Sequence, residues 1–225
     1  MGEVTITRHG QANSGAKSEL EYDKLSELGH VQARWLGEYL QDAQPYTHII
    51  SGSLRRQRET AEGILAGLGG PAIPHTTDAR LNELDYFALS DSLTDMHGVP
   101  FPDSAETFAA HVPQILSHWA AEETPPHVES YAGFRTRIFD AVRDASLIEG
   151  RVLLVSSTGV IASLTALALG LETTQKAKMF LNVAHTSLHG FDYRTMNGAS
   201  DLHLTMYGST PHLDRADRTD KKTMV

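Results

Sequence analysis

The residues best suited to chemistry stand near the start of the chain, as Arg8-His9-Gly10. They follow Val4–Thr7, where apolar residues alternate with threonines, a pattern typical of a β-strand. In an open α/β sheet, ligands bind at the carboxyl ends of the strands. A histidine beside an arginine at such an end can act on a phosphate group as a nucleophile or as an acid and base. Gly10 lets a ligand approach the backbone closely because it has no side chain.

A second group of cations, Arg55, Arg56 and Arg58, follows Thr47–Ser51, a short run that predicts a second strand. The helix that begins there favours anions at its start, because its unpaired N–H groups and its dipole are positive at that end. Arg55 and Arg58 each have a glutamate four residues later, which indicates ion pairs on the helix surface. Arg56 is therefore the candidate for a phosphate contact.

Other kinds of catalytic or metal site are disfavoured. The pairs His111/His118 and His185/His189 have no third ligand at a suitable spacing, so structural or surface roles are favoured over metal binding. Ser51-Gly52-Ser53 lacks the flanking glycines and the base of a nucleophile elbow. The absence of cysteine excludes disulfides, thiolate metal sites and cysteine catalysis. We expect no metal and no other cofactor.

The composition restricts the class of protein and its partners. The 225 residues are enough for one α/β domain with a full core. The formal net charge of -9 makes nucleic acid and anionic membranes poor partners, so a phosphate site has to be a local concentration of cations. The chain has no apolar run long enough to span a membrane, and its start lacks the pattern of a secretion signal. We expect a cytoplasmic protein.

The elements that must position these residues alternate between strands and helices. Val152–Ser156 is nearly all apolar, as in a central parallel strand that is covered on both faces. The further predicted strands are 4–7, 47–51 and a closing hairpin at 188–193 and 202–207; the predicted helices lie within about 26–40, 52–68, 108–119, 134–145, 160–169 and 173–181. We therefore predict an α/β fold, a three-layer αβα sandwich with a mostly parallel central sheet.

Two segments are expected to lie outside this regular framework. Residues 88–105, with Gly98, Pro100 and Pro102, are expected to form a loop or lid. Residues 214–225 carry mixed charge and little to bury, so they are expected to form a mobile tail. The remaining residues, 1–213, are predicted to form a single domain.

Five blocks occur along the chain in a fixed order. They are Arg8-His9-Gly10; Leu25-Ser26-x-x-Gly29-x-x-Gln32-Ala33; Ser51-x-x-Leu54-x-Arg56-x-x-x-Thr60-Ala61; Leu81-x-Glu83; and Val155-Ser156-x-x-Gly159-Val160-Ile161. In this order they resemble the histidine phosphatase superfamily, in its phosphoglycerate mutase-like branch. The resemblance extends from Val4 to about Leu213.

The resemblance implies a role for four residues. It implies that His9 takes up the phosphoryl group as a phosphohistidine, and that Arg8 and Arg56 bind the phosphate. Guanidinium groups suit phosphate oxygens and the charge spread over them in the transition state. It implies that Glu83 is the general acid, which protonates the leaving oxygen and then activates water. It implies no metal requirement.

The chain departs from the family after the central strand. The family usually has Val-Ser-His-Gly-Gly, whereas this chain has Ser157 and Thr158 in place of the histidine and the first glycine. A serine is shorter than a histidine and cannot be a cation, and the loss of such a donor costs about 10²–10³ in rate. Ser157 and Thr158 are nevertheless expected to contact the phosphate, as are Asn13 and Ser14, which lie where the family often places further donors.

Several functions stay open after this departure. The chain could be a slow phosphatase, a non-catalytic relative that binds phosphorylated ligands, or a protein in which Ser157 is an engineered change. The presence of His9, Arg8, Arg56 and Glu83 favours the enzyme. Rescue of the missing histidine by His185 is a further hypothesis.

The substrate is expected to be a small phosphorylated molecule. The mutases of the family tend to have an arginine directly after the acid, whereas here Leu84 follows Glu83. A phosphomonoesterase is therefore favoured over a phosphoglycerate mutase. The oligomeric state, a homodimer included, is left open.

Overall fold

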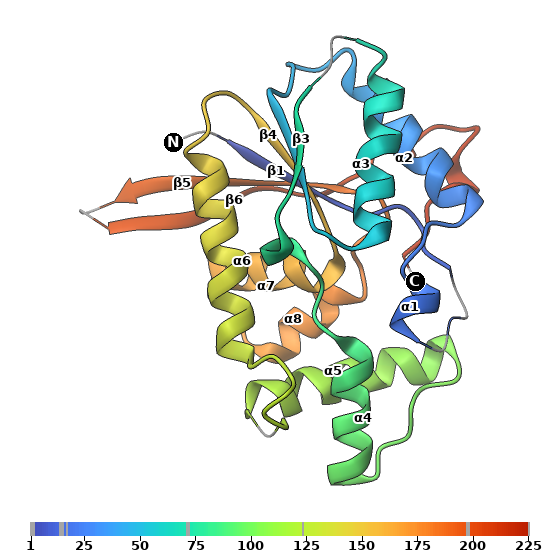
Figure 1. Ribbon diagram of the computed structural model, residues 1–225, viewed down its shortest axis with the longest axis vertical. Helices are drawn as coiled ribbons and strands as arrows, with labels where there is room; N and C mark the ends of the chain where they lie inside the picture. Colours follow the sequence, from blue (N-terminus) through green and yellow to red (C-terminus); the bar gives the residue numbers. More distant parts are fainter. Residues whose placement is uncertain are drawn as a thin grey trace.

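A six-stranded sheet runs through the middle of the molecule in the computed structural model, which describes residues 3–13, 16, 18–70, 73–122, 124–196 and 199–224. The strand order is β3-β2-β4-β1-β5-β6 (Figure 1). The bounds are β1 Val4–Arg8, β2 His48–Ser51, β3 His75–Thr77, β4 Val152–Ser156, β5 Leu188–Met196 and β6 Ala199–Ser209. The pairs β1–β4, β4–β2 and β2–β3 are parallel, whereas β1–β5 and β5–β6 are antiparallel. The mostly parallel sheet and the closing hairpin are confirmed.

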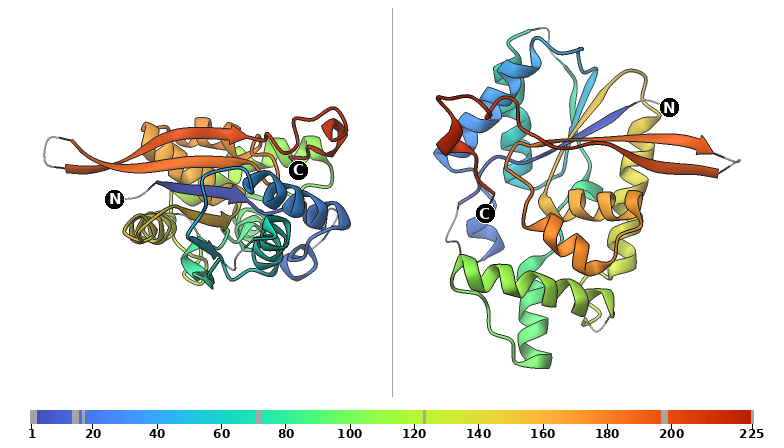
Figure 2. Two further views of the ribbon diagram at one scale, coloured as in Figure 1. Left: turned by 90° about the horizontal axis from the view of Figure 1, so that it is seen from above. Right: turned by 180° about the vertical axis from the view of Figure 1, so that it is seen from behind.

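Helices cover both faces of the sheet, as predicted for a three-layer αβα sandwich. Helices α2 (Glu27–Leu40) and α3 (Arg55–Leu68) lie on one side, and α6 (Tyr131–Ser146), α7 (Thr158–Leu169) and α8 (Thr173–Phe180) on the other (Figure 2). The alternation along β4 explains this: Leu153 and Val155 pack with α2 and α3, whereas Val152 and Leu154 pack with the opposite layer. Burying each such side chain stabilises the fold by about 1.5–3 kcal/mol.

The structure differs from the expected loop or lid at residues 88–105. Residues 88–97 belong to a helix, α4 (Tyr86–His97), which is followed by α5 (Ala105–Ala120). Asp85 caps α4 by accepting the N–H of Ala88, Leu89 and Leu93 are buried, and Gly98 ends the helix in the left-handed conformation. The polar residues between the two leucines hide this apolar spacing in the sequence. Both helices lie beyond the carboxyl ends of the strands (Figure 1).

The described part of the C-terminal segment, expected to be a mobile tail, contacts the carboxyl edge of the sheet. The side-chain amide of Gln32 donates to the carbonyl of Lys221 at 2.8 Å and to Oγ1 of Thr223 at 3.1 Å. The N–H of His185 donates to the carbonyl of Thr223 at 2.9 Å. Hydrogen bonds from buried side chains hold this segment, and a composition with little to bury does not reveal them. Among the described helices, none has the length and apolar content to cross a membrane.

Candidate active site

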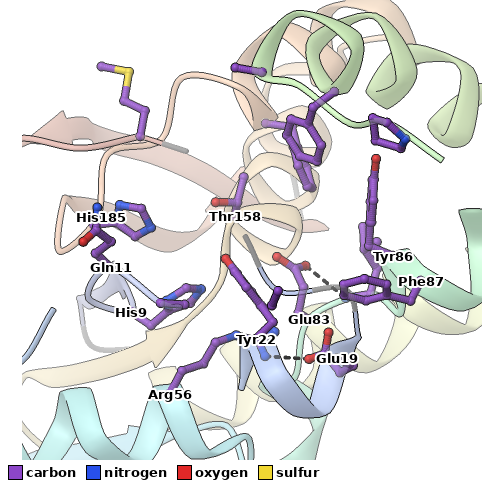
Figure 3. A pocket seen from close by; sticks show the side chains of 18 of the residues that line it. His9, Gln11, Glu19, Tyr22, Arg56, Glu83, Tyr86, Phe87, Thr158 and His185 are labelled. Carbon is purple, nitrogen blue, oxygen red and sulfur yellow. Dashed lines mark hydrogen bonds and ion pairs between the residues drawn. The ribbon is translucent and has the colours of Figure 1, made fainter. Parts of the chain in front are cut away.

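A cavity of about 850 Å³ opens at the carboxyl edge of the sheet. Five of the sequence-predicted site residues line it: Arg8, His9, Arg56, Glu83 and Thr158. They come from the end of β1, the start of α3, the segment before α4 and the start of α7. Because the parallel strands all end at this edge, residues far apart in the sequence meet here (Figure 3).

His9 is held with one defined ring nitrogen protonated. Its backbone N–H donates to the carbonyl of Ser156 at 2.9 Å, which fixes the residue against the end of β4. Its Nδ1 lies 2.7 Å from the carbonyl oxygen of Gly10. A carbonyl can only accept, so Nδ1 carries the proton and Nε2 has a free electron pair. Burial, helped by the charges of Arg56 and Arg8, lowers the pKa of His9 well below 6.5. His9 is therefore neutral at pH 7 and can act as a nucleophile through Nε2.

The two predicted phosphate arginines already have partners. Arg8 donates through Nη1 to the carbonyl of Val183 at 2.5 Å and to the carbonyl of Met224. Arg56 is 1% exposed and contacts Glu19 at 2.5 Å and Asp23 at 3.1 Å through Nη1. Its Nε has no partner among the described residues. A phosphate at this end of the cavity would find one guanidinium held by carbonyls and one paired with carboxylates.

Glu83 lies at the start of α7, where two backbone N–H groups hold its carboxyl group. Oε2 accepts from the N–H of Gly159 and Oε1 from that of Leu84, both at 2.9 Å. Burial raises the pKa of Glu83 above 4.5 even though these donors and the two arginines oppose the rise. A carboxyl group that keeps its proton more readily than usual, fixed at the cavity, suits general-acid chemistry.

Of the other predicted phosphate contacts that the structure describes, Thr158 lines the cavity, whereas Ser157 and Asn13 do not. Thr158 lines it, and its buried Oγ1 has no partner within the described part of the chain. The Oγ of Ser157 instead accepts from the side-chain amide of Gln57 at 2.8 Å, and Ser157 is absent from the lining. Asn13 donates to a backbone carbonyl, that of Glu21, and does not line the cavity either. Ser14 lies outside the described residues.

His185 lines the cavity beside His9, with 5.7 Å between the ring centroids. It is 2% exposed, and its Nδ1 contacts the carbonyl of Thr223 at 3.1 Å. Burial, with Arg8 nearby, lowers the pKa of His185 well below 6.5. The next residue, Thr186, has a φ of 57°, a strained conformation for a β-branched residue. Sequence spacing could not place this histidine, since an unusual turn before β5 carries it into the site.

Two further lining residues, Glu19 and Tyr22, come from a short helix, α1 (Glu19–Tyr22). It lies within residues 11–24, whose polar, glycine-containing sequence predicts a loop. The ring of Tyr22 lies 4.8 Å from the guanidinium carbon of Arg56. Neither residue belongs to any of the five sequence blocks. The only signal available was that this polar loop follows His9 and could line a site.

The other three histidines of the two sequence pairs bond side-chain hydroxyls, and His118 bonds that of Ser92 at 3.1 Å. His111 bonds the hydroxyl of Tyr86 at 2.8 Å, and His189 bonds that of Ser187 at 2.9 Å. The ion pair predicted on the surface of α3 forms between Arg55 and Glu59 at 2.6 Å. Within the described ranges, no three His, Cys, Asp or Glu side chains are grouped so that they could hold a metal ion.

Known proteins match this chain over nearly its whole length. A model of the histidine phosphatase superfamily (branch 1) matches residues 4–203. A Salmonella choleraesuis protein named "Probable phosphoglycerate mutase GpmB" is 30% identical over 95% of this chain and 96% of its own length. A solved mycobacterial glucosyl-3-phosphoglycerate phosphatase with inorganic phosphate is 24% identical, has a TM-score of 0.64, and covers 94% of this chain and 99% of its own. A phosphoserine phosphatase of Entamoeba histolytica is 19% identical, with a TM-score of 0.63 over 95% of this chain and 100% of its own.

Proposed function

The chain belongs to the histidine phosphatase superfamily (branch 1), and on that premise we propose that it hydrolyses phosphate monoesters through a phosphohistidine at His9. The observation that carries the proposal is the state of His9: its Nδ1 proton is bound by the carbonyl of Gly10, and its low pKa leaves Nε2 unprotonated. Arg8 and Arg56 line the same end of the cavity and would hold the phosphate oxygens.

The first step forms the phosphoenzyme. Nε2 of His9 attacks phosphorus while the bond from phosphorus to the ester oxygen breaks, and Glu83 gives its proton to that oxygen. Three buried donors on the lining have no partner in the described part of the chain, and they would bind the oxygens of the transferring group: Arg8 Nε, Arg56 Nε and Thr158 Oγ1. General-acid assistance of this kind contributes about 10²–10⁴ in rate.

The second step returns the enzyme to its starting state. The carboxylate of Glu83 takes a proton from a water molecule, and the water oxygen attacks phosphorus as its bond to Nε2 of His9 breaks. Inorganic phosphate leaves, Glu83 is protonated again and His9 is neutral. One carboxyl group thus serves as acid in the first step and as base in the second.

His185 is proposed to replace the family's second histidine, because Ser157 bonds Gln57 and is absent from the cavity lining. Nδ1 of His185 contacts the carbonyl of Thr223 at 3.1 Å and its Oγ1 at 2.9 Å, which leaves Nε2 for the phosphoryl group. An arriving dianion favours the imidazolium form, which can donate through Nε2. We expect His185→Gln to lower kcat by about 10²–10³, whereas His127→Gln, on the exposed surface, leaves it unchanged. An unchanged rate in His185→Gln would exclude this role.

Hydrolysis is proposed over phosphoryl transfer between positions of phosphoglycerate, despite the name of the Salmonella relative. A mutase needs a cation for the carboxylate of phosphoglycerate. Of the described lining residues, Arg8 and Arg56 are the only arginines or lysines, and both lie at the phosphate end. Glu19 and Asp103 on the lining would repel a carboxylate.

The test is phosphate release from para-nitrophenyl phosphate by the wild type, His9→Ala and the surface control His127→Ala. We expect turnover in the wild type and the control, and loss of turnover in His9→Ala. Equal turnover in all three proteins would place the chemistry elsewhere. If the wild type does not turn over but inorganic phosphate raises its melting temperature, and Arg56→Ala abolishes that rise, the protein binds phosphorylated ligands without hydrolysing them.

A further inference from the structure

The cavity extends well beyond the room that a phosphate group needs. Its volume of about 850 Å³ lies within the range of about 300–1,000 Å³ found for sites that enclose a whole organic ligand. His9, His185 and Arg56 lie at one end, and Tyr86 and Phe87 lie at the other, with Glu83 and Thr158 between them (Figure 3). The leaving group of a phosphate monoester held at His9 would therefore extend toward the aromatic end.

The far end is a wall of four aromatic rings, here called the aromatic wall: Tyr86, Phe87, Phe101 and Phe108. Phe87 and Phe101 are stacked, with 5.5 Å between ring centroids and 15° between planes. Tyr86 and Phe108 lie 5.3 Å apart. The rings come from α4, α5 and the segment between them, so these helices together form the wall.

The packing of the core leaves the four rings of the aromatic wall partly exposed. Phe101 is 43% exposed, and the other three rings are only partly buried. The hydroxyl of Tyr86 is bonded to Nδ1 of His111, so this polar group has a partner within the protein. Partly exposed rings that line a cavity beside a catalytic centre provide apolar surface that a ligand can cover.

Two polar side chains at the rim, Asp103 and Ser104, form hydrogen bonds at the start of α5. Oδ1 of Asp103 accepts the hydroxyl of Thr107 at 3.2 Å, and Oγ of Ser104 accepts the N–H of Thr107 at 3.2 Å. Apart from Arg8, Arg56 and Glu83, the described cavity lining has two charged side chains, and both are carboxylates: Glu19 and Asp103. A leaving group with a second negative charge would meet no cation there.

We propose that the natural substrate is a phosphate monoester of an aromatic alcohol or phenol, with its ring against the aromatic wall. This inference rests on the proposed function. The phosphorus–oxygen bond breaks at His9 as before, and the apolar alcohol leaves with the proton from Glu83. Phe101 and Phe108 are then specificity-determining residues, because they contact the leaving group and not the phosphate.

The test compares phenethyl phosphate with ethyl phosphate, two alkyl esters that differ in the aromatic ring. We expect kcat/KM to be higher for phenethyl phosphate by roughly tenfold or more, the scale of discrimination available in an apolar pocket. Phe101→Ala should bring this ratio close to one by lowering kcat/KM for phenethyl phosphate. The control Leu147→Ala, at an exposed position after α6, should keep the ratio. A ratio near one in the wild type, or an unchanged ratio in both Phe101→Ala and Phe108→Ala, would overturn the inference.

Phosphoramidate, a small phosphoryl donor without an organic group, separates this inference from the proposed function. If phosphoramidate phosphorylates His9 but the ratio is near one, the phosphatase chemistry stands and the substrate class is wrong. If neither phosphoramidate nor any ester phosphorylates His9, the proposed function fails and the substrate class fails with it.

Discussion

Replacing Gly159 by alanine should displace the general acid while leaving its carboxyl group chemically intact. A Cβ at this position would lie 2.3 Å from Oε1 of Glu83 and 2.7 Å from Cδ2 of Leu84. Ordinary contacts begin at 3.4 Å, so the carboxyl group has to move by about 1 Å and loses its 2.9 Å bond from the N–H of residue 159. A shift of this size in a catalytic group costs about 10² in rate.

The loss in Gly159→Ala should depend on the leaving group. Ethyl phosphate needs the proton from Glu83 to form the phosphoenzyme, so its kcat/KM should fall by about 10², whereas para-nitrophenolate leaves without a proton and its kcat/KM should fall far less. Steady-state kinetics with both esters measures the difference. The control is Gly70→Ala, whose added methyl would meet no atom closer than 3.7 Å. An equal loss for both esters, or no loss for either, would refute the reasoning.

Three further predictions concern charge. Glu19→Gln removes a carboxylate that pairs with Arg56 and would compete with phosphate for it. The KM for phosphate esters should therefore fall by about two- to fivefold, the scale of a partly exposed ion pair. A rise in KM would contradict this. His9 has a lowered pKa and Glu83 a raised one. Calculated on the concentration of the ester dianion, kcat/KM for alkyl phosphates should therefore show no acidic limb from His9 and should fall as pH rises through the pKa of Glu83; a profile that rises there would be contrary evidence. Burial lowers the pKa of Lys176 to about 7 from 10.5, so between these values the unfolded state binds more protons than the folded state and the free energy of unfolding should rise with pH. Denaturant titrations at several pH values should show a smaller rise in Lys176→Met. An equal rise in the wild type and the variant would exclude this cause.

The sequence predicted the parts of the site that depend on local pattern. Apolar runs marked the strands, and residues just after them, such as His9 and Thr158, meet at the carboxyl edge because parallel strands end together. The helices α3 and α7, which begin at Arg55 and Thr158, were predicted from their apolar residues within about 52–68 and 160–169. These features follow from a few consecutive residues, so a sequence is enough to find them.

The parts that depend on packing between distant segments were not predictable in this way. Helix α4 was expected to be a loop, and without that helix the aromatic wall does not exist. Ser157 bonds Gln57, which lies 100 positions away in the chain. The C-terminal segment contacts the site through Thr223, and only the folded chain brings that residue to His185.

The most direct measurement of the central claim is the chemical state of His9 in Glu83→Gln protein during turnover of para-nitrophenyl phosphate. This ester needs no proton to leave, so His9 should still be phosphorylated, whereas water should attack slowly without the carboxylate base. After an alkaline quench, which preserves phosphohistidine, site-resolved mass spectrometry should find the phosphoryl group on His9 in most molecules. Unmodified His9 after release of nitrophenol, or a phosphoryl group on another residue, would contradict the account.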